Sequence, residues 1–328
     1  MDINRTSGKR VSASQRDAVT AQNNQATIHK TWKSLAAVAF GLFLSVPGLT
    51  QAQYSFTTID VPNAIATAAN GNSTNAIAGQ FDDANGRHGF VLKNGGFTTI
   101  NAPGAEGGTI INGINAPGQL AGTFNVTGGT PHAFFDNNGF FTTLDPPNST
   151  RSQGGFINAK GQVVGTYRGI VKTGDTNQTR HGFIWRNGAF TTFNVPGDDP
   201  VLGTVAFGIN DIGEVVGDYV AAGDVNPDGT AKHRHGFLRS SKGDFTTFDV
   251  PGAVITIGEG INNPGTIVGL YVANGNMHGF VLKNSVFTTV DVSDQPTEIN
   301  SINAKGEIVG FYSDSNGVQH GFLGVPTH

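Results

Sequence analysis

Six histidines recur at one position of a repeated motif, each a near-constant distance ahead of a carboxylate or amide side chain. They open a His-Gly/Ala-Phe triplet, at intervals of 44, 49, 54, 43 and 42 residues, as His88, His132, His181, His235, His278 and His320. An imidazole beside a carboxylate serves in acid–base catalysis and as a metal ligand. The same pairing also serves in structural hydrogen bonds that fix the histidine tautomer.

The partner of each histidine follows from a second motif, Phe-Thr-Thr, which begins at residues 56, 97, 141, 190, 245 and 287. A tight turn such as Asn94-Gly95 joins the two motifs into a hairpin. Counting outward from the turn, with one extra residue in the hairpin of His235, gives the pairs His88–Asn101, His132–Asp145, His181–Asn194, His235–Asp249 and His278–Asp291. His320 has no Phe-Thr-Thr after it, so it would meet Asp60 from the beginning of the repeats.

These pairs have two interpretations. As functional groups they would make six metal or acid–base sites. However, a catalytic site is normally unique, and zinc needs three or four convergent ligands, whereas histidines on separate units of a ring would radiate from its axis. We therefore favour hydrogen bonds that lock each hairpin.

The elements that must position these residues are short strands. Between the two motifs lies a Gly-Ile-Asn-x-x-Gly-x-Ile-Val-Gly-x-Tyr pattern, clearest at 208–219 and 260–271, and Gly, Asn and Pro bound each segment. Four strands per unit and six units predict an all-β fold, a six-bladed β-propeller with four antiparallel strands per blade. Strand 54–60 would pair with strand 320–323 and close the ring. A parallel β-helix, the alternative, would not explain these complementary ends.

The repeated units resemble those of the HAF-repeat proteins, a family of predicted bacterial extracellular proteins. The resemblance covers roughly residues 54–323 and rests on the His-Gly/Ala-Phe and Phe-Thr-Thr motifs. It implies a bacterial protein outside the cytoplasm. It implies no activity, because none is established for the family.

Residues 1–52 have the order of a secretory signal peptide. A polar, basic stretch precedes an apolar run at 34–47, and small residues suit cleavage after Ala52. The basic stretch is long, so the true start could lie after Met1, and a membrane anchor is the alternative. We expect residues 53–328 to form one propeller domain, secreted to the extracellular space or the periplasm.

Composition narrows the function classes. The net charge of −4 becomes −8 once residues 1–52 are removed, which argues against nucleic acid and anionic membranes as partners. The chain has no cysteine, which excludes a disulfide scaffold and a lipoprotein. We expect a monomer without stable membrane insertion.

Departures from the repeat are better candidates for a site than the repeat itself. In each unit, a loop connects the aromatic residue that ends the second strand to the histidine of the third. This loop is longest in units three and four, at 168–180 and 220–234. They should cluster with the connection after Asn194 on one face, where loops on a rigid scaffold usually bind ligands. The candidate ligand-binding residues are Arg168, Asp175, Arg180, Asp198, Asp199, Tyr219, Asp228, His233 and Arg234. Alternatively, these loops carry no function.

Tyr219 belongs to an aromatic ring made by Phe81, Phe124, Tyr167, Tyr219, Tyr271 and Tyr312. These side chains could stack on sugars, one per blade, or pack between blades.

Within the longer loop, Asp224, Asn226 and Asp228 followed by Gly229 match the first half of a calcium loop. The twelfth position is His235 rather than Glu, so an ordinary turn is the alternative. We expect no other cofactor.

The sequence contains no nucleophile elbow, Walker loop, HExxH or dinucleotide fingerprint. We therefore expect an extracellular binding or scaffold module whose ligand is a glycan or a protein. One alternative is a carbohydrate-active hydrolase or lyase with its site on the variable loops of units three and four. Another is a purely structural component of the cell envelope.

Overall fold

A computed structural model describes residues 50–51, 54–170 and 178–327. All regular elements in this part of the chain are β-strands, and it contains no helix long and apolar enough to cross a bilayer. The predicted signal segment lies outside the described residues, except for β1 (Thr50–Gln51), which pairs in parallel with β22 (Val286–Val290). Asp175 also lies outside them.

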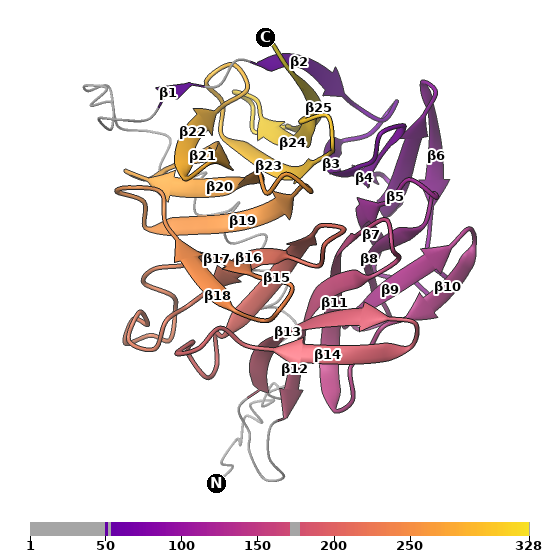
Figure 1. Cartoon of the computed structure of the whole chain (residues 1–328). Coiled ribbons are helices and arrows are strands. Elements are labelled where there is room, and N and C mark those ends of the chain that lie inside the picture. The colour runs from indigo at the N-terminus through magenta and orange to yellow at the C-terminus, as the bar shows by residue number, and fades with distance from the viewer. Residues whose placement is uncertain (1–49, 52–53, 171–177, 328) are drawn as a thin grey trace, which may run out of the picture.

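The strands form six antiparallel sheets, which follow one another around a ring (Figure 1). Blade 1 contains β3 (Ala66–Asn72), β4 (Ala76–Asp83), β5 (Gly86–Lys93) and β6 (Gly96–Ile100). Blade 2 contains β7 (Thr109–Ile114), β8 (Leu120–Asn125), β9 (Pro131–Asn137) and β10 (Phe140–Thr143). Blade 3 contains β11 (Ser149–Ile157), β12 (Val163–Ile170), β13 (Gln178–Arg186) and β14 (Ala189–Phe193).

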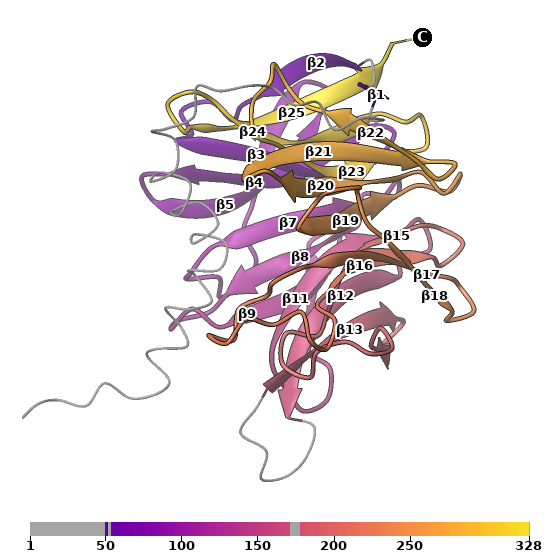
Figure 2. The ribbon, with the colours of Figure 1, turned by 90° about the vertical axis from the view of Figure 1, so that its left-hand side faces the viewer.

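Blade 4 contains β15 (Thr204–Ile209), β16 (Val215–Tyr219), β17 (His235–Arg239) and β18 (Phe245–Phe248). Blade 5 contains β19 (Ile255–Ile261), β20 (Ile267–Ala273), β21 (Asn276–Lys283) and β22. Blade 6 contains β23 (Thr297–Ile302), β24 (Ile308–Ser313) and β25 (Gln319–Pro326), and its outer strand is β2 (Tyr54–Ile59). The predicted six-bladed propeller is therefore confirmed, and Figure 2 shows it from the side.

The ring closes between the two ends of the repeat region. β2 pairs with β25 in an antiparallel ladder that runs from Tyr54 opposite Pro326 to Ile59 opposite Gly321. This ladder extends beyond the predicted 320–323 on the C-terminal side. Because β2 is the outer strand of blade 6, the two ends of the repeat region hold each other in place without a disulfide.

The phenylalanines of the two motifs form the core. The six of the His-Gly/Ala-Phe triplets are at most 1% exposed: Phe90, Phe134, Phe183, Phe237, Phe280 and Phe322. Each contacts the phenylalanine of the neighbouring Phe-Thr-Thr, with ring centroids 5.3–5.8 Å apart. A Cβ on the preceding strand would collide with this ring. At Gly217, for example, it would lie 2.7 Å from the Phe237 ring and would also clash with the Val205 carbonyl oxygen.

The asparagines of the Gly-Ile-Asn pattern link neighbouring blades. The side-chain amide of Asn158 donates to the Asn210 carbonyl oxygen at 2.9 Å, and that of Asn210 donates to Asn262 at 3.2 Å. Asn115 and Asn262 continue the same chain of bonds to the next blade. Each bond satisfies a buried carbonyl oxygen of the adjacent blade. This requirement explains why units of different length all carry the asparagine of the motif.

Candidate functional site

Each predicted histidine partner is hydrogen bonded in the structure. The imidazole Nδ1 lies 2.6–3.0 Å from a side-chain oxygen in the pairs His88–Asn101, His132–Asp145, His181–Asn194, His235–Asp249, His278–Asp291 and His320–Asp60. Because carboxylate and amide oxygens only accept, the Nδ1–H must donate in every pair. The bond ties the third strand of a blade to the end of its fourth, in all six blades alike.

An aromatic side chain on the second strand covers each histidine. The ring centroids are 5.1–5.6 Å apart in the pairs Phe81–His88, Phe124–His132, Tyr167–His181, Tyr219–His235, Tyr271–His278 and Tyr312–His320. Phe81, Phe124 and Tyr271 are only 7%, 9% and 5% exposed. These three therefore pack between blades and leave no face on which a sugar could stack. The tyrosines also use their hydroxyl groups, since that of Tyr271 lies 2.9 Å from Oγ1 of Thr289.

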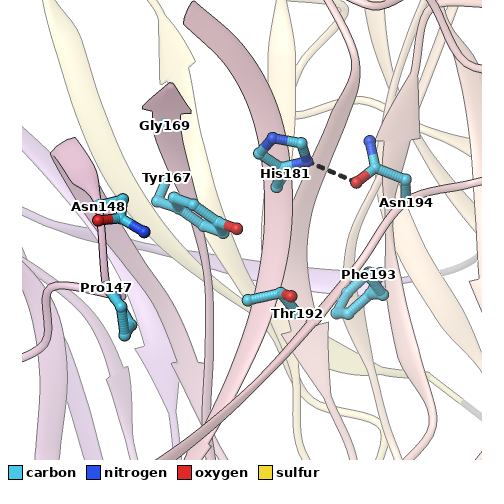
Figure 3. Close-up of a pocket in the computed structure, with 8 residues that line it drawn as sticks. All are labelled: Pro147, Asn148, Tyr167, Gly169, His181, Thr192, Phe193 and Asn194. Atoms are coloured by element: carbon cyan, nitrogen blue, oxygen red, sulfur yellow. Dashed lines mark hydrogen bonds between the residues drawn. The ribbon is translucent and has the colours of Figure 1, made fainter. Parts of the chain in front are cut away.

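In blade 3, an open cavity of about 430 Å³ lies beside the aromatic residue that covers the histidine. Its lining combines the Tyr167 ring with polar side chains of His181, Thr192 and Asn194, and with Asn148 from the connection between blades 2 and 3. Figure 3 shows the Tyr167 ring between Asn148 on one side and the His181–Asn194 hydrogen bond on the other. An aromatic face bordered by several hydrogen-bonding groups is a composition suited to a small polar ligand.

The local sequence explains why the cavity lies here. In the other blades, the residue after the partner of the histidine donates its backbone N–H to a threonine of the next inner strand, as Val195 does to Thr204 at 2.9 Å. Pro146 occupies this position after Asp145 and has no N–H to donate. Ser152 instead donates to Asp145, with an oxygen–oxygen distance of 2.6 Å. The connection of residues 144–148 is the shortest of the six, and it borders the cavity.

Asp198 and Asp199, predicted to reach a ligand, stabilise the connection between blades 3 and 4. The Asp198 carboxylate accepts hydrogen bonds from the Asn194 amide at 2.6 Å and from the Thr204 hydroxyl at 2.7 Å. The Asp199 carboxylate accepts from the backbone N–H groups of Val201 and Leu202. The connection lies beside the loop after Tyr219, as predicted, because Asp198 and Ala221 form an isolated antiparallel β-bridge.

In the long loop of blade 4, the acidic side chains form hydrogen bonds with other residues of the same blade. The Asp224 carboxylate contacts His233 Nδ1 at 3.1 Å and His235 Nε2 at 3.0 Å. Burial lowers the pKa of His235, but the hydrogen bonds that its imidazole donates to the Asp224 and Asp249 carboxylates together outweigh burial and raise that pKa above its ordinary value. Asp228 instead accepts from the backbone and hydroxyl of Thr230, while Asn226 contacts the same threonine. No cluster of three or more His, Asp or Glu side chains suited to a metal occurs among the described residues.

The predicted arginines form a second group, which sequence reasoning found only in part. Arg168 lies opposite Arg180 on the neighbouring strand, and Arg151, which was not predicted, lies opposite Arg168. Arg234 forms an ion pair of 2.6 Å with Asp218, whose side chain is fully buried. Burial, followed by the charges of Arg168, Arg234 and Arg151, lowers the pKa of Arg180 to about 9. The structure thus brings together three predicted arginines from two blades.

The inner strands of blades 5 and 6 carry two acidic residues that the sequence analysis missed. Burial and the neighbouring Glu298 raise the pKa of Glu259 well above its ordinary value, and burial raises that of Glu298 to about 7. Glu259 lies at a β-bulge between Gly258 and Gly260, so the repeat pattern did not show where its side chain would point. The only detectable signal was a single charged residue on each of two otherwise uncharged inner strands.

No model of a known protein family matches the chain, and no curated protein matches it. Among solved structures, a protein of unknown function from Dyadobacter fermentans is similar, with a TM-score of 0.54 and 10% identity over 85% of this chain and 99% of that one. The β-propeller domain of the trilobed protease from Pyrococcus furiosus matches with a TM-score of 0.47 and 9% identity, over 80% and 94% of the two chains. The six-bladed fucose lectin of Aleuria aurantia gives 0.45 and 14%, over 83% and 98%. These similarities concern the fold alone.

Proposed function

We propose that the protein is a secreted binding module and that the cavity beside Tyr167 takes a sugar unit of an extracellular glycan. The observation that carries this proposal is the composition of the cavity, with the ring of Tyr167 beside the polar side chains of Asn148, His181 and Asn194. Sugars present apolar C–H faces and rings of hydroxyl groups, which suit an aromatic face and neutral hydrogen-bonding side chains together.

Two further features support a binding role. The cavity is lined by strands of blade 3 and by the connection that precedes them, and hydrogen bonds already orient some of the groups that a ligand would meet. The histidine is oriented by its bond to Asn194, and the Tyr167 hydroxyl is hydrogen bonded to Thr192. Since the other blades lack the proline that alters the preceding connection, the proposal predicts one site in blade 3 rather than six equivalent sites.

A crystal structure of the protein soaked with mixed neutral and acidic oligosaccharides would test this proposal. We expect one ordered sugar in contact with Tyr167 and Asn148. Six sugars around the ring would instead favour a lectin with repeated sites, and no sugar at Tyr167 under conditions of measured glycan binding would refute the assignment.

A second candidate function is hydrolysis or elimination on a polysaccharide, and the observation that favours it is the pair Glu259 and Glu298. Glu259 and Glu298 lie on the adjoining inner strands β19 and β23, and a carboxyl group whose pKa burial raises can act as a general acid near neutral pH. Release of reducing ends from polysaccharides by the wild-type protein, abolished in Glu298→Gln, would support this candidate. Absence of turnover on substrates that bind would exclude it.

A further inference from the structure

The turn between the first two strands of a blade has one form in blades 2 to 6 and a shorter form in blade 1. In blades 2 to 6, an asparagine N–H donates to the carbonyl oxygen four residues later, as Asn115 does to Gln119 at 3.1 Å. In blade 1, the corresponding bond joins Ser73 to Ala76, only three residues later, at 2.9 Å. Ala76 also stands where blades 2, 3, 4 and 6 have glutamine or glutamate. The shorter turn and the smaller side chain leave space beside the neighbouring turn of blade 6.

A cavity of about 260 Å³ lies at this place between blades 1 and 6. It is on the opposite face of the ring from the cavity beside Tyr167, because the second strand of a blade runs from one face to the other. Its lining combines the two turns with three partly buried aliphatic side chains, those of Ile77, Leu92 and Leu323. Pockets for drug-sized ligands have volumes of about 300–1,000 Å³. This cavity therefore suits a smaller molecule with both polar and aliphatic parts.

Asn72, which lines the cavity, has a buried side-chain oxygen without a partner. It stands where the other five blades have isoleucine, and it is only 9% exposed. Its amide nitrogen donates to the backbone carbonyl oxygen of Glu307 at 2.9 Å. Since a carbonyl oxygen only accepts, the nitrogen must face it, and the side-chain oxygen remains without a hydrogen-bond partner among the described residues. Buried polar groups are rarely left unpaired, so a donor from a bound molecule would stabilise this arrangement.

The turn of blade 6 supplies a charge of each sign at the same cavity. In the sequence, no other of the six turns has both a basic and an acidic residue. Lys305 Nζ lies 3.8 Å from Glu307 Oε1, and the Lys305 side chain is 56% exposed. Such an exposed pair contributes little to stability, so both groups can bind a ligand at small cost. The other carboxylate oxygen of Glu307 accepts from the Asn303 amide at 2.6 Å, which orients the carboxylate.

We propose that this cavity binds a free α-amino acid with an aliphatic side chain. The ligand ammonium group would donate to the Glu307 carboxylate and to the side-chain oxygen of Asn72, and the ligand carboxylate would accept from Lys305. The two charged groups of an α-amino acid share one carbon, so they match a cation and an anion that are themselves close together. Charge-assisted hydrogen bonds would fix the ligand, and its side chain would bury apolar surface against the three aliphatic residues. This site is separate from the glycan site.

The first test is a calorimetric titration of the full chain with leucine, leucinamide and N-acetylleucine, together with the melting temperature in each ligand. Leucinamide lacks the carboxylate, and N-acetylleucine lacks the ammonium group. We expect saturable binding of leucine and about tenfold weaker binding of each analogue. Glycine, which lacks the aliphatic side chain, should also bind more weakly than leucine. Leucine that gives neither saturable heat nor a higher melting temperature would overturn the proposal, as would equal affinities for the four ligands.

The second test uses Glu307→Gln and Lys305→Met, with Glu214→Gln and Lys160→Met as controls at the same turn positions of blades 4 and 3. Glutamine stands at the Glu307 position in blades 2 and 3, so the turn accepts it. We expect Glu307→Gln to bind leucine about tenfold more weakly and no better than N-acetylleucine. Lys305→Met should no longer prefer leucine to leucinamide, and both controls should keep the wild-type affinity.

An affinity for leucine that is unchanged in Glu307→Gln and Lys305→Met, or reduced equally in the controls, would overturn the assignment of this site. The glycan function is tested separately, because neither substitution touches the lining of the cavity beside Tyr167. Glycan binding retained in a variant that has lost leucine binding would support two independent sites.

Discussion

His320 donates a hydrogen bond of 2.9 Å to Asp60, although 260 residues separate the two in sequence. In every other blade, the equivalent histidine hydrogen bond lies within one hairpin. Here the same bond joins the two ends of the repeat region. It lies at the end of the β2–β25 ladder, which closes the ring. The repeated pair thus serves the closure of the fold as well as the stability of each blade.

Removing the closing bond should loosen the first strand. Asp60→Ala is expected to lower the melting temperature by about 2–4 °C, since one such hydrogen bond contributes about 1 kcal/mol. It should also speed hydrogen exchange at the amides of β2. Asp291→Ala, which removes the equivalent bond inside blade 5, is the control and should lower the melting temperature while β2 exchange stays unchanged. Equal exchange in both variants would contradict a special role of Asp60 in closure.

The histidines within blades should act as structural residues. His278→Ala removes a hydrogen bond of 2.7 Å to Asp291 and the ring that Tyr271 covers. We expect the melting temperature to fall by several degrees, with glycan binding unchanged. Differential scanning calorimetry measures the first quantity and a binding titration the second. An unchanged melting temperature would refute the structural role of the repeat histidine.

Stability should decrease as the pH rises from about 5 to 8. Glu259, Glu298 and His235 have pKa values that are raised in the folded protein. Each group therefore makes its full contribution to the free energy of unfolding below its pKa in the unfolded chain. That contribution is lost as the pH rises through the pKa of the same group in the folded protein. Asp218 and Arg234 also act on Glu259, with opposite signs. Glu298→Gln should flatten the dependence of melting temperature on pH, whereas Glu106→Gln, at an exposed position, should not. A melting temperature that rises over this range would contradict the assignment.

Calcium should bind weakly or not at all. The Asp224 carboxylate faces His233 and His235, and Asp228 is bound to Thr230, so the oxygens of the predicted calcium loop are already used. Titration calorimetry with calcium chloride is expected to give no saturable heat. A saturable signal that Asp228→Asn removes would restore the calcium interpretation.

The repeated features could be predicted from the sequence, while the unique ones mostly could not. Strand order and closure follow from two motifs that occur six times, because each copy constrains the register of the others. The environments of Glu298 and Arg151 depend on neighbouring residues of another blade or strand, which the repeat does not show. At Glu259, a β-bulge shifts the register by one residue. Pro146 was visible in the sequence as the one proline at a repeat position that holds valine in four units and alanine in one. Its effect on the connection into blade 3 depends on hydrogen bonds that only the structure shows.

The most direct test of the proposed binding site compares Tyr167→Ala with Tyr312→Ala. Both variants delete an aromatic residue that covers a repeat histidine, but only Tyr167 lines the cavity of blade 3. The measurement is the affinity for the oligosaccharide that gives the strongest wild-type signal on a glycan array. We predict a loss of about tenfold or more for Tyr167→Ala and wild-type affinity for Tyr312→Ala. Equal affinities in the two variants would contradict a glycan site in blade 3.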